Sequence, residues 1–481
     1  MNGLIRIGAL AAVLGAAGCA VAPLDRAADA AANRVNERVS VEPAWPPEAG
    51  ETDVAPDIGE ALTLPAALAI AFTRNPDIRR QYARLGIAHA ELQDAARIAN
   101  PSLSLAWLSP NNGGRDQTTQ GISASFADLL LLSARRRLSA AEFRRVELAV
   151  GSDLVALAHE VETSWYAHVG SLQVAAMRAA VAEAAQTEAE LAKRFHEAGN
   201  ISRLQFDLQQ AAAARAGIEA LHAQSDAAAS RAQLANLLGL PAIAAWRTVD
   251  RLAAPPDMTL SPDELMERAL SQRLDVAAAH EEVALLEDAL GVTGRWRLLG
   301  SVEAGYERER GTDEPTVRGP TLNLELPLFN QGQGAVARAE AQLRDARARA
   351  QALALSVENE VVTGVEQLTL AREISERYRR ELLPATASAV VRQQERVNYM
   401  LVSPFDLIRT RRDEYDAWQD YFESVRDYWI ARTALRAATG GLLPGDEKSL
   451  PLTIGVEEIV APEAETTEED EMQHKHPGEQ P

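Results

Sequence analysis

The chain has 481 residues, enough for two or three ordinary domains or for one elongated one. Its formal net charge of −21 argues against a nucleic-acid-binding protein, which would need a basic surface. Aromatic residues make up only 5% of the chain and alanine is abundant, which favours long, closely packed helices over a thick globular core. The single cysteine, Cys19, excludes an intramolecular disulfide and a cysteine-based metal cage.

The first residues have the pattern of an export signal. Arg6 supplies a positive charge, residues 7–17 form an apolar run, and small residues precede Cys19. A lone cysteine directly after such a run resembles a bacterial lipobox, in which the thiol is lipidated and becomes the first residue. We predict a signal peptide at 1–18, lipidation of Cys19 and a tether at 19–61. An ordinary signal peptide with an incidental cysteine is the alternative.

The rest of the chain repeats itself at an offset of about 198 residues. The segment LTLPAALAIAFTRNPDI matches LSPDELMERALSQRLDV, which places Asp77 over Asp275. At the same offset, GISASFADLLLLSARRR lies over GPTLNLELPLFNQGQGA. Further on the offset drifts slightly, and Ser202 falls over Ser403. We therefore predict a first repeat at 62–240, a linker at 241–259, a second repeat at 260–440 and an acidic, disordered tail at 441–481.

In the first half, a helix is predicted over 65–98, since proline at 65 is tolerated in a first helical turn. Pro101 ends it, and SLSLAWL then alternates Leu103, Leu105 and Trp107 in the period of a strand. A loop separates this strand from a second one in GISASFADLLL. No proline occurs from 134 to 197, which predicts a helix of about 60 residues. The segment AGNIS interrupts it, and a helix over 203–238 follows.

The second half repeats this order, with helices over 263–296, 335–397 and 404–439 and strands over 300–308 and 320–329. Pro384 lies inside the second long helix and should kink it. In each half the two shorter helices can stack end to end beside the long one. We predict an elongated, coiled-coil-like rod with the strands at one end and the helix-to-helix turns at the other.

The strands are apolar on one face only, as Leu322, Leu324 and Leu326 alternate with Asn323 and Glu325. The four strands of one chain cannot close a sheet, and an open edge in a bilayer leaves backbone groups unsatisfied. Three copies would supply twelve strands, an even number within the range of outer-membrane barrels. We predict that Asn323 and Glu325 face the lumen of such a barrel. The predicted lipid-facing residues are Leu103, Leu105, Trp107, Leu322 and Leu324.

These elements, in this order, resemble the TolC family of outer-membrane efflux proteins. The resemblance covers 62–440 and is carried by LTLPAALAIAFTRNPDI, the strand after ANPSL, LELPLFNQGQG, FHEAGNISRLQF and ANLLGLP. It implies a mainly α-helical homotrimer, with a long helical barrel through the periplasm that continues into a twelve-stranded β-barrel in the outer membrane. It also implies a periplasmic adaptor and an inner-membrane pump of the RND type as partners. ANPSL and the lipoprotein start resemble the heavy-metal branch of the CzcC and CusC type, which suggests heavy-metal cations as cargo.

The turns between the long helices and their partners are the predicted contact with the adaptor, because apolar residues at a helix tip in water suggest a covering partner. The predicted tip comprises Gly199, Asn200, Ile201, Ser202, Leu401, Val402 and Ser403. Just inside it, a three-fold ring of charges could close the tunnel. The predicted gate comprises Asp406, Arg409, Arg412 and Asp413. A charge ladder on a solvated helix face is the alternative interpretation of these four residues.

No catalytic motif is present, since the chain has no Gly-rich phosphate loop, no HExxH and no Ser-centred elbow. We expect neither an enzyme nor a bound cofactor. Histidines on helices, such as His159, His168 and His196, are expected to be solvent-exposed rather than metal ligands. His474 and His476 in the acidic tail could loosely chelate a divalent cation, but a solubilising tail is the favoured interpretation.

Two other functions fit part of the pattern. A periplasmic coiled-coil adaptor would also be exported and helical, but it should carry a β-rich, lipoyl-like segment between its helices. A helical scaffold lipoprotein would explain the alanine-rich periodicity. It would not explain amphipathic strands at matching positions in both halves.

Overall fold

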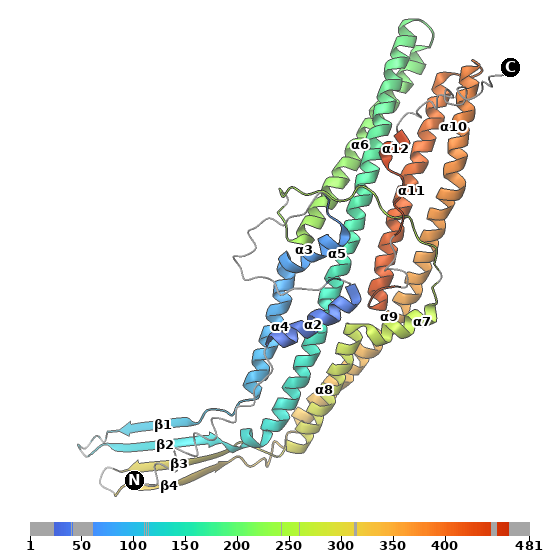
Figure 1. The fold of residues 1–481 in the computed structure, drawn as a ribbon. Coiled ribbons are helices and arrows are strands. Elements are labelled where there is room, and N and C mark those ends of the chain that lie inside the picture. Colours follow the sequence, from blue (N-terminus) through green and yellow to red (C-terminus); the bar gives the residue numbers. More distant parts are fainter. Residues whose placement is uncertain are drawn as a thin grey trace, which may run out of the picture.

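The computed structural model describes residues 24–39, 41, 61–109, 111, 113, 115–241, 243–258, 260–311, 315–443 and 450–460. The predictions for the signal peptide, for Cys19 and for His474 and His476 lie outside these residues. Figure 1 shows an elongated bundle of helices with one small sheet at its end, and the long helices turn back at the opposite end. The predicted rod is therefore confirmed.

The first half contains α3 (Leu64–Arg74), α4 (Pro76–Ala95), β1 (Ser102–Leu108), β2 (Gln117–Ser125), α5 (Phe126–Glu197) and α6 (Arg203–Leu238). The helix predicted over 65–98 is in fact two helices. They separate at Asn75, whose backbone is extended as expected before a proline and whose side chain caps α4 by accepting a hydrogen bond from the Asp77 amide. The helix α5 is 72 residues long, because Ser125 caps it much earlier than position 134.

The second half contains α7 (Pro262–Gln272), α8 (Leu274–Trp296), β3 (Val302–Arg310), β4 (Val317–Leu324), α9 (Gln333–Arg377), the π-helical turn η2 (Tyr378–Leu382), α10 (Leu383–Asn398) and α11 (Pro404–Thr439). The strand predicted to reach 329 ends at Leu324, ahead of Pro327, which has no amide to donate. Leu326 therefore lies beyond the strand. Pro384 falls in the first turn of α10, directly after η2, so the long helix departs from α geometry just before the proline.

A helix that the sequence analysis did not predict packs on the outside of this bundle. It is α2 (Leu24–Val39), which buries Val35 and Val39 and pairs Arg34 with Glu147 of α5 at 2.6 Å. A second short helix, α12 (Val456–Val460), lies near the other end of the chain. Isolated bridges join Leu62 to Thr248 and Ala253 to Leu452, so that the segments flanking the two halves form a band at mid-length (Figure 1).

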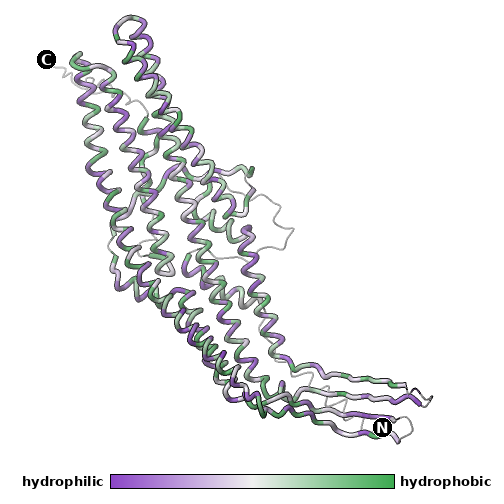
Figure 2. The backbone as a smooth tube through the Cα atoms, turned by 180° about the vertical axis from the view of Figure 1, so that it is seen from behind, coloured by the Kyte–Doolittle hydropathy of each residue, from purple (hydrophilic) through white to green (hydrophobic). Residues whose placement is uncertain are grey.

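The core is a long seam between helices rather than a central mass. Its fully buried side chains include Leu154, Met177, Leu234, Phe422 and Leu435, which come from α5, α6 and α11. Figure 2 shows hydrophobic and hydrophilic residues alternating along every long helix, as expected where each helix buries one stripe. Among the described residues, no helix combines the length and the apolar character needed to cross a membrane.

Candidate functional site

The four strands form one antiparallel sheet in the order β1-β2-β3-β4, and its register brings the apolar residues together. Leu103 pairs with Ile122, which pairs in turn with Tyr306. The same face carries Leu105, Trp107, Val302, Ala304, Leu322 and Leu324. The predicted lipid-facing residues therefore share one face, and in the single chain their side chains are between 47% and 69% exposed.

The opposite face of the sheet is polar. Asn323 lies there, paired with Glu303, and Gln117 donates a hydrogen bond to Glu309 at 2.6 Å. Glu307 shares this face by alternation, so β3 presents three carboxylates to it. The sequence analysis singled out Asn323 but not these glutamates, although the alternation in VEAGYERER carries the signal. Glu325, also predicted to face the lumen, follows the end of β4, and its carboxylate accepts a hydrogen bond from the Ser301 amide at 3.2 Å.

Both outer strands of the sheet have one free edge in the single chain. The strands β1 and β4 each pair with one neighbour only. Unpaired edges of this kind are templates for pairing with another strand. The described sheet of the single chain therefore has an exposed apolar face bounded by two free edges.

At the other end, the two helix tips are built on one plan. After α5, Gly199 has a φ of 78° and the Asn200 amide donates to the Phe195 carbonyl at 2.8 Å. After α10, Met400 has a φ of 55° and the Leu401 amide donates to the Arg396 carbonyl at 2.9 Å. Met400 is the one described residue other than glycine with a positive φ, a conformation that is strained for a side chain with a Cβ.

The exposed apolar surface of the tips differs from the expected one. Ile201 and Val402 are half-buried, whereas Leu401 is 69% exposed, Tyr399 78% and Met400 93%. The sequence analysis missed Tyr399 and Met400. The available signal was the duplication, which places Met400 over Gly199 and so puts a large side chain where the turn requires a positive φ. The described apolar tip surface therefore belongs chiefly to the second half.

Of the predicted gate residues, Asp406 caps a helix. Its carboxylate accepts a hydrogen bond from the Ser403 amide at 3.2 Å and so completes a capping box at the start of α11. Ser202 and Gln205 form the same box at the start of α6. Each tip is thus followed by a helix whose first turn is fixed by its own side chains.

Arg412 is held within the chain rather than free at the tip. It pairs at 3.1 Å with Glu188 of α5, whose side chain is only 3% exposed. Burial raises the pKa of Glu188, and Arg412 and Arg409 partly offset this effect. Arg409 and Asp413 are exposed. Glu188 was not predicted, because its burial depends on α11 packing against α5.

Further along α11, acidic residues follow one another at helical spacing. Arg178 of α5 pairs with Asp416 at 3.0 Å and with Glu219 at 3.3 Å. Burial raises the pKa of Asp416 and of Asp420, and the neighbouring carboxylates raise both further. Asp413, Asp416, Asp420 and Glu423 thus form a stripe of negative charge, which the sequence analysis did not identify.

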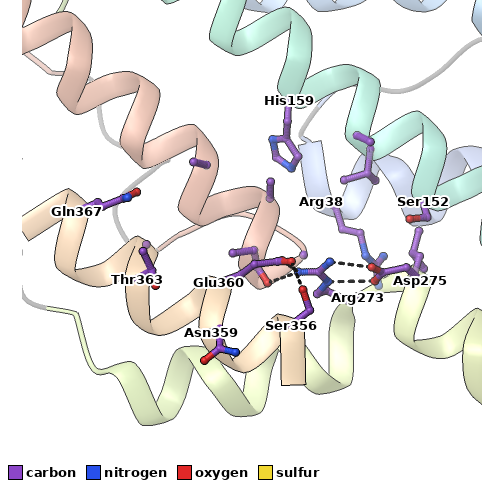
Figure 3. Close-up of a pocket in the computed structure, with 18 residues that line it drawn as sticks. Arg38, Ser152, His159, Arg273, Asp275, Ser356, Asn359, Glu360, Thr363 and Gln367 are labelled. Carbon is purple, nitrogen blue, oxygen red and sulfur yellow. Dashed lines mark hydrogen bonds and ion pairs between the residues drawn. The ribbon is translucent and has the colours of Figure 1, made fainter. Parts of the chain in front are cut away.

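A cavity of about 700 Å³ lies at mid-length, between α5, α9 and the junction of α8 with α11. Figure 3 shows the Arg273 guanidinium between Asp275 and Glu360, with hydrogen bonds to both. Burial alone would lower the pKa of Arg273, but these two carboxylates raise it. Arg273 also donates to the Ala438 carbonyl at 3.1 Å, which ties the start of α8 to the end of α11.

The first half has the same joint without the charge. There the Asn75 amide donates to the Leu237 carbonyl at 2.7 Å and ties the start of α4 to the end of α6. Because both halves place a hydrogen-bonding side chain at this position, we interpret Arg273 as a structural joint. Among the described residues, no group of three or more histidine, cysteine or acidic side chains is arranged to hold a metal ion.

The prediction that helix histidines are solvent-exposed is wrong for three of them, namely His89, which is 8% exposed, and two residues of α5. His159 is 6% exposed and lies 3.5 Å from Glu162, which is itself paired with Arg436. His168 is 2% exposed and its ring lies 3.0 Å from the Ser230 hydroxyl. Burial, with a smaller contribution from Arg231, lowers the pKa of His168 to about 4. Both rings lie in the helix seam, because α5 has neighbours on most of its circumference.

Comparison with known proteins gives matches in structure alone. No family model matches the chain, and a search of curated proteins gives no match either. The outer-membrane channel OprN aligns with a TM-score of 0.64 and 16% identity over 79% of this chain and 90% of its own. The outer membrane protein VceC of Vibrio cholerae aligns with a TM-score of 0.62 and 16% identity, over 79% of this chain and 96% of its own.

CusC, whose structures describe transmembrane channel formation, aligns with a TM-score of 0.60 and 16% identity over 79% of this chain and 92% of its own. The likeness covers nine tenths or more of each of these three chains. At this level of identity it is a likeness of fold. The chain therefore has the fold of TolC-type outer-membrane channels, which confirms the fold class predicted from the order of its strands and helices.

Proposed function

We propose that this protein is the outer-membrane channel of a tripartite efflux system and not an enzyme. In this proposal three copies form a closed barrel in the membrane and a helical tunnel in the periplasm. An inner-membrane pump of the RND type and a periplasmic adaptor deliver substrates, and the channel is their passive exit duct. Support for this comes from the fold and from the chemistry of the two ends of the rod.

The observation that carries the proposal is the sheet with one apolar face and two free edges. If β4 of one copy pairs with β1 of the next, every edge is satisfied and the ring closes after three copies. The leucines then face lipid and the polar face lines the lumen. The function of an adaptor or of a helical scaffold does not explain such a sheet, because in water the apolar face of the sheet would stay exposed.

Two measurements on the full-length protein test this proposal. The purified protein should run as an oligomer of three chains that dissociates on heating, and it should form ion-conducting pores in planar bilayers. A monomer that stays soluble without detergent and forms no pores would favour the scaffold. Restoration of efflux to a strain that lacks its own channel would separate the channel from the adaptor.

The proposed docking surface for the adaptor is the tip, extended to Tyr399 and Met400. Exposed apolar side chains at a helix tip favour a partner that covers them. We expect Leu401→Asp to abolish efflux in a complementation assay while the oligomer and its pores stay intact. The matched variant is Ile201→Asp, which places the same charge at a half-buried position of the first tip. Normal transport by both variants would show that the contact lies elsewhere.

The proposed cargo, heavy-metal cations, has a separate test. The three glutamates on the polar face of β3 favour cations in the lumen, since charged rings set the selectivity of a pore. Deletion of the gene should then raise sensitivity to metal ions more than sensitivity to organic drugs. If sensitivity to organic drugs rose more, the channel function would stand, but heavy-metal cations would not be its cargo.

The proposed membrane anchor is a lipid on Cys19, in addition to the barrel. A protein processed in this way begins at Cys19, and its first residue carries acyl chains. Mass spectrometry of the mature N-terminus decides the question. A start at another residue, with an unmodified thiol at Cys19, would remove the anchor and leave the channel unaffected.

A further inference from the structure

Three arginines gather at the end of the sheet that lies farthest from the helices, on the face that carries the leucines. Arg308 of β3 pairs directly with Arg318 of β4, and Arg310 lies two residues further along β3, opposite Thr118. All three side chains are exposed. Within the part of the chain that the structure describes, none of them forms an ion pair or a side-chain hydrogen bond.

Such an arrangement is unfavourable as far as the described residues go. Like charges directly opposite each other across two strands destabilise the pair, and a residue two positions along lies within reach of long side chains. The acidic residues of β3, namely Glu303, Glu307 and Glu309, point to the other face of the sheet and do not offset the charge. The residues that share the arginine face within the strands, Gln120, Tyr306 and Pro320, are neutral, and Asp116, which precedes β2 on this face, forms no ion pair with the arginines in the described part of the chain.

Some exposed arginines on the helices have an acidic partner four residues away, as Arg349 has Asp345 and Arg377 has Glu373. The three arginines of the sheet instead lie next to one another, two of them directly opposite across the strands. The strands thus concentrate positive charge that the described residues leave uncompensated. A negatively charged group from outside the chain would remove the repulsion.

The position of the arginines on the sheet identifies that group. From the helix end outward, the lipid-facing surface begins with Leu324 and Leu322, continues through Tyr306 and Leu103, and ends at the arginines. Trp107 lies in the same row as Arg310, at the height where aromatic residues mark a membrane interface. The arginines therefore stand at headgroup level, on the side of the membrane away from the helices.

We propose that Arg308, Arg310 and Arg318 bind the phosphate groups of the phosphorylated glycolipid that forms the outer leaflet of the bacterial outer membrane. Guanidinium groups form bidentate hydrogen bonds with phosphate, and three of them within one headgroup's reach match a lipid that carries more than one phosphate. This inference rests on the proposed function, because it requires the sheet to span that membrane.

The test compares lipid retention by two triple variants. The variant Arg308→Gln, Arg310→Gln, Arg318→Gln removes the cluster. The control Arg338→Gln, Arg392→Gln, Arg396→Gln removes the same charge from exposed positions on the helices. Each oligomer is purified from vesicles that contain phosphatidylcholine and bisphosphorylated glycolipid, and the retained glycolipid is counted by native mass spectrometry.

We expect the wild type and the control to retain the glycolipid and the cluster variant to retain about tenfold less, because charge-assisted hydrogen bonds to phosphate are lost. The wild type should retain far less of the dephosphorylated glycolipid. Equal retention by the two triple variants would overturn the proposal. Equal retention of phosphatidylglycerol and glycolipid by the wild type would overturn the assignment to the glycolipid.

Pore formation separates this inference from the function on which it rests. The cluster variant should conduct ions in phosphatidylcholine bilayers as the wild type does, since its lumen is unchanged. Conducting pores together with unchanged glycolipid retention would defeat the lipid assignment alone. A wild type that neither inserts nor conducts would defeat the proposed function as well.

Discussion

The two halves of the chain share their backbone joints but fill them with different side chains. The first tip turns at Gly199 and the second at Met400, both with positive φ, and a capping box follows each. At mid-length Gly239 caps the end of α6 and Gly440 caps the end of α11, again with positive φ. The backbone geometry at the tips and at mid-length is thus fixed by a residue with positive φ and by helix caps. The other side chains of the two halves can therefore differ.

The difference is one of charge as well as of size. The strand β1 has no charged residue, whereas its counterpart β3 has three glutamates and two arginines. Asn75 at the first joint corresponds to Arg273 at the second, and the large exposed tip side chains belong mainly to the second half, with Leu204 as the exception. We infer that the first half chiefly completes the scaffold, while the second half carries the contacts with ions and partners.

The largest expected effect comes from two neighbouring residues of β4 that lie on opposite faces. Arginine on the lipid face costs about 2–4 kcal/mol near the membrane midplane and less toward its edges, so Leu322→Arg, one row further into the sheet than Leu324, should impair assembly. Asn323→Arg places the same charge in the lumen and should assemble normally with altered conductance. The fraction of heat-dissociable oligomer in the membrane measures the first effect and single-channel recording the second. Equal assembly of both variants would show that the faces are assigned wrongly.

How far the sequence predicts this molecule depends on whether a local signal exists. The helices over 203–238 and 404–439 were predicted to the residue, because a serine cap and a glycine mark their ends. The residues that share the apolar face of the sheet were predicted, because their alternation is local. The break at Arg273 has no proline or glycine to announce it, and it depends on Glu360, 87 residues away.

The same limit applies to the candidate sites. Glu188 sits in an alanine-rich helix and becomes notable only when Arg412 of α11 reaches it. Likewise Arg308 and Arg318 become a pair only through the register of β3 with β4. Residues whose role arises from long-range packing are therefore the ones that the sequence analysis left out.

The second prediction concerns the two mid-length joints. Arg273→Ala leaves Asp275, Glu360 and the Ala438 carbonyl without their partner, and because both carboxylates are partly exposed this loss should lower the free energy of unfolding by about 2 kcal/mol. Asn75→Ala removes uncharged hydrogen bonds and should cost about 1–2 kcal/mol. Thermal unfolding of the full-length protein, followed by circular dichroism, ranks the two. If both variants lost the same stability, the charge at the second joint would be of no structural consequence.

The third prediction separates the two roles assigned to Asp406. As a capping residue it corresponds to Gln205, and loss of either side chain should cost about 1 kcal/mol. As a gate residue it has no counterpart in the first half. Asp406→Ala should therefore raise the resting conductance of the pore without any adaptor, whereas Gln205→Ala should not.

The variant Asp406→Gln serves as the control for charge, because it keeps a hydrogen-bond acceptor at the capping position. If the carboxylate itself blocks the pore, this variant conducts like Asp406→Ala while it retains most of its stability. Unchanged conductance in both variants would place the gate at another level of the tunnel, and the buried pair of Glu188 with Arg412 would be the next position to examine.

The smallest expected effect on stability, at Met400, is the most informative about the tips. A residue with a Cβ in the left-handed region is strained by about 1 kcal/mol, and glycine relieves this strain but makes the unfolded chain more flexible. Met400→Gly should therefore leave stability unchanged or raise it by less than about 1 kcal/mol. Gly199→Met, the reciprocal variant, should lower it by about 1–2 kcal/mol.

Efflux by the Met400→Gly variant should fall, although its stability should not. The Met400 side chain is 93% exposed and makes no contribution to the seam, so its removal takes away only surface that a partner could cover. If the second half carries the docking contact, Met400→Gly transports poorly although it folds at least as well as the wild type. Full transport by this variant would mean that the strain at Met400 serves no docking role, and the functional division between the two tips would then rest on Tyr399 and Leu401 alone.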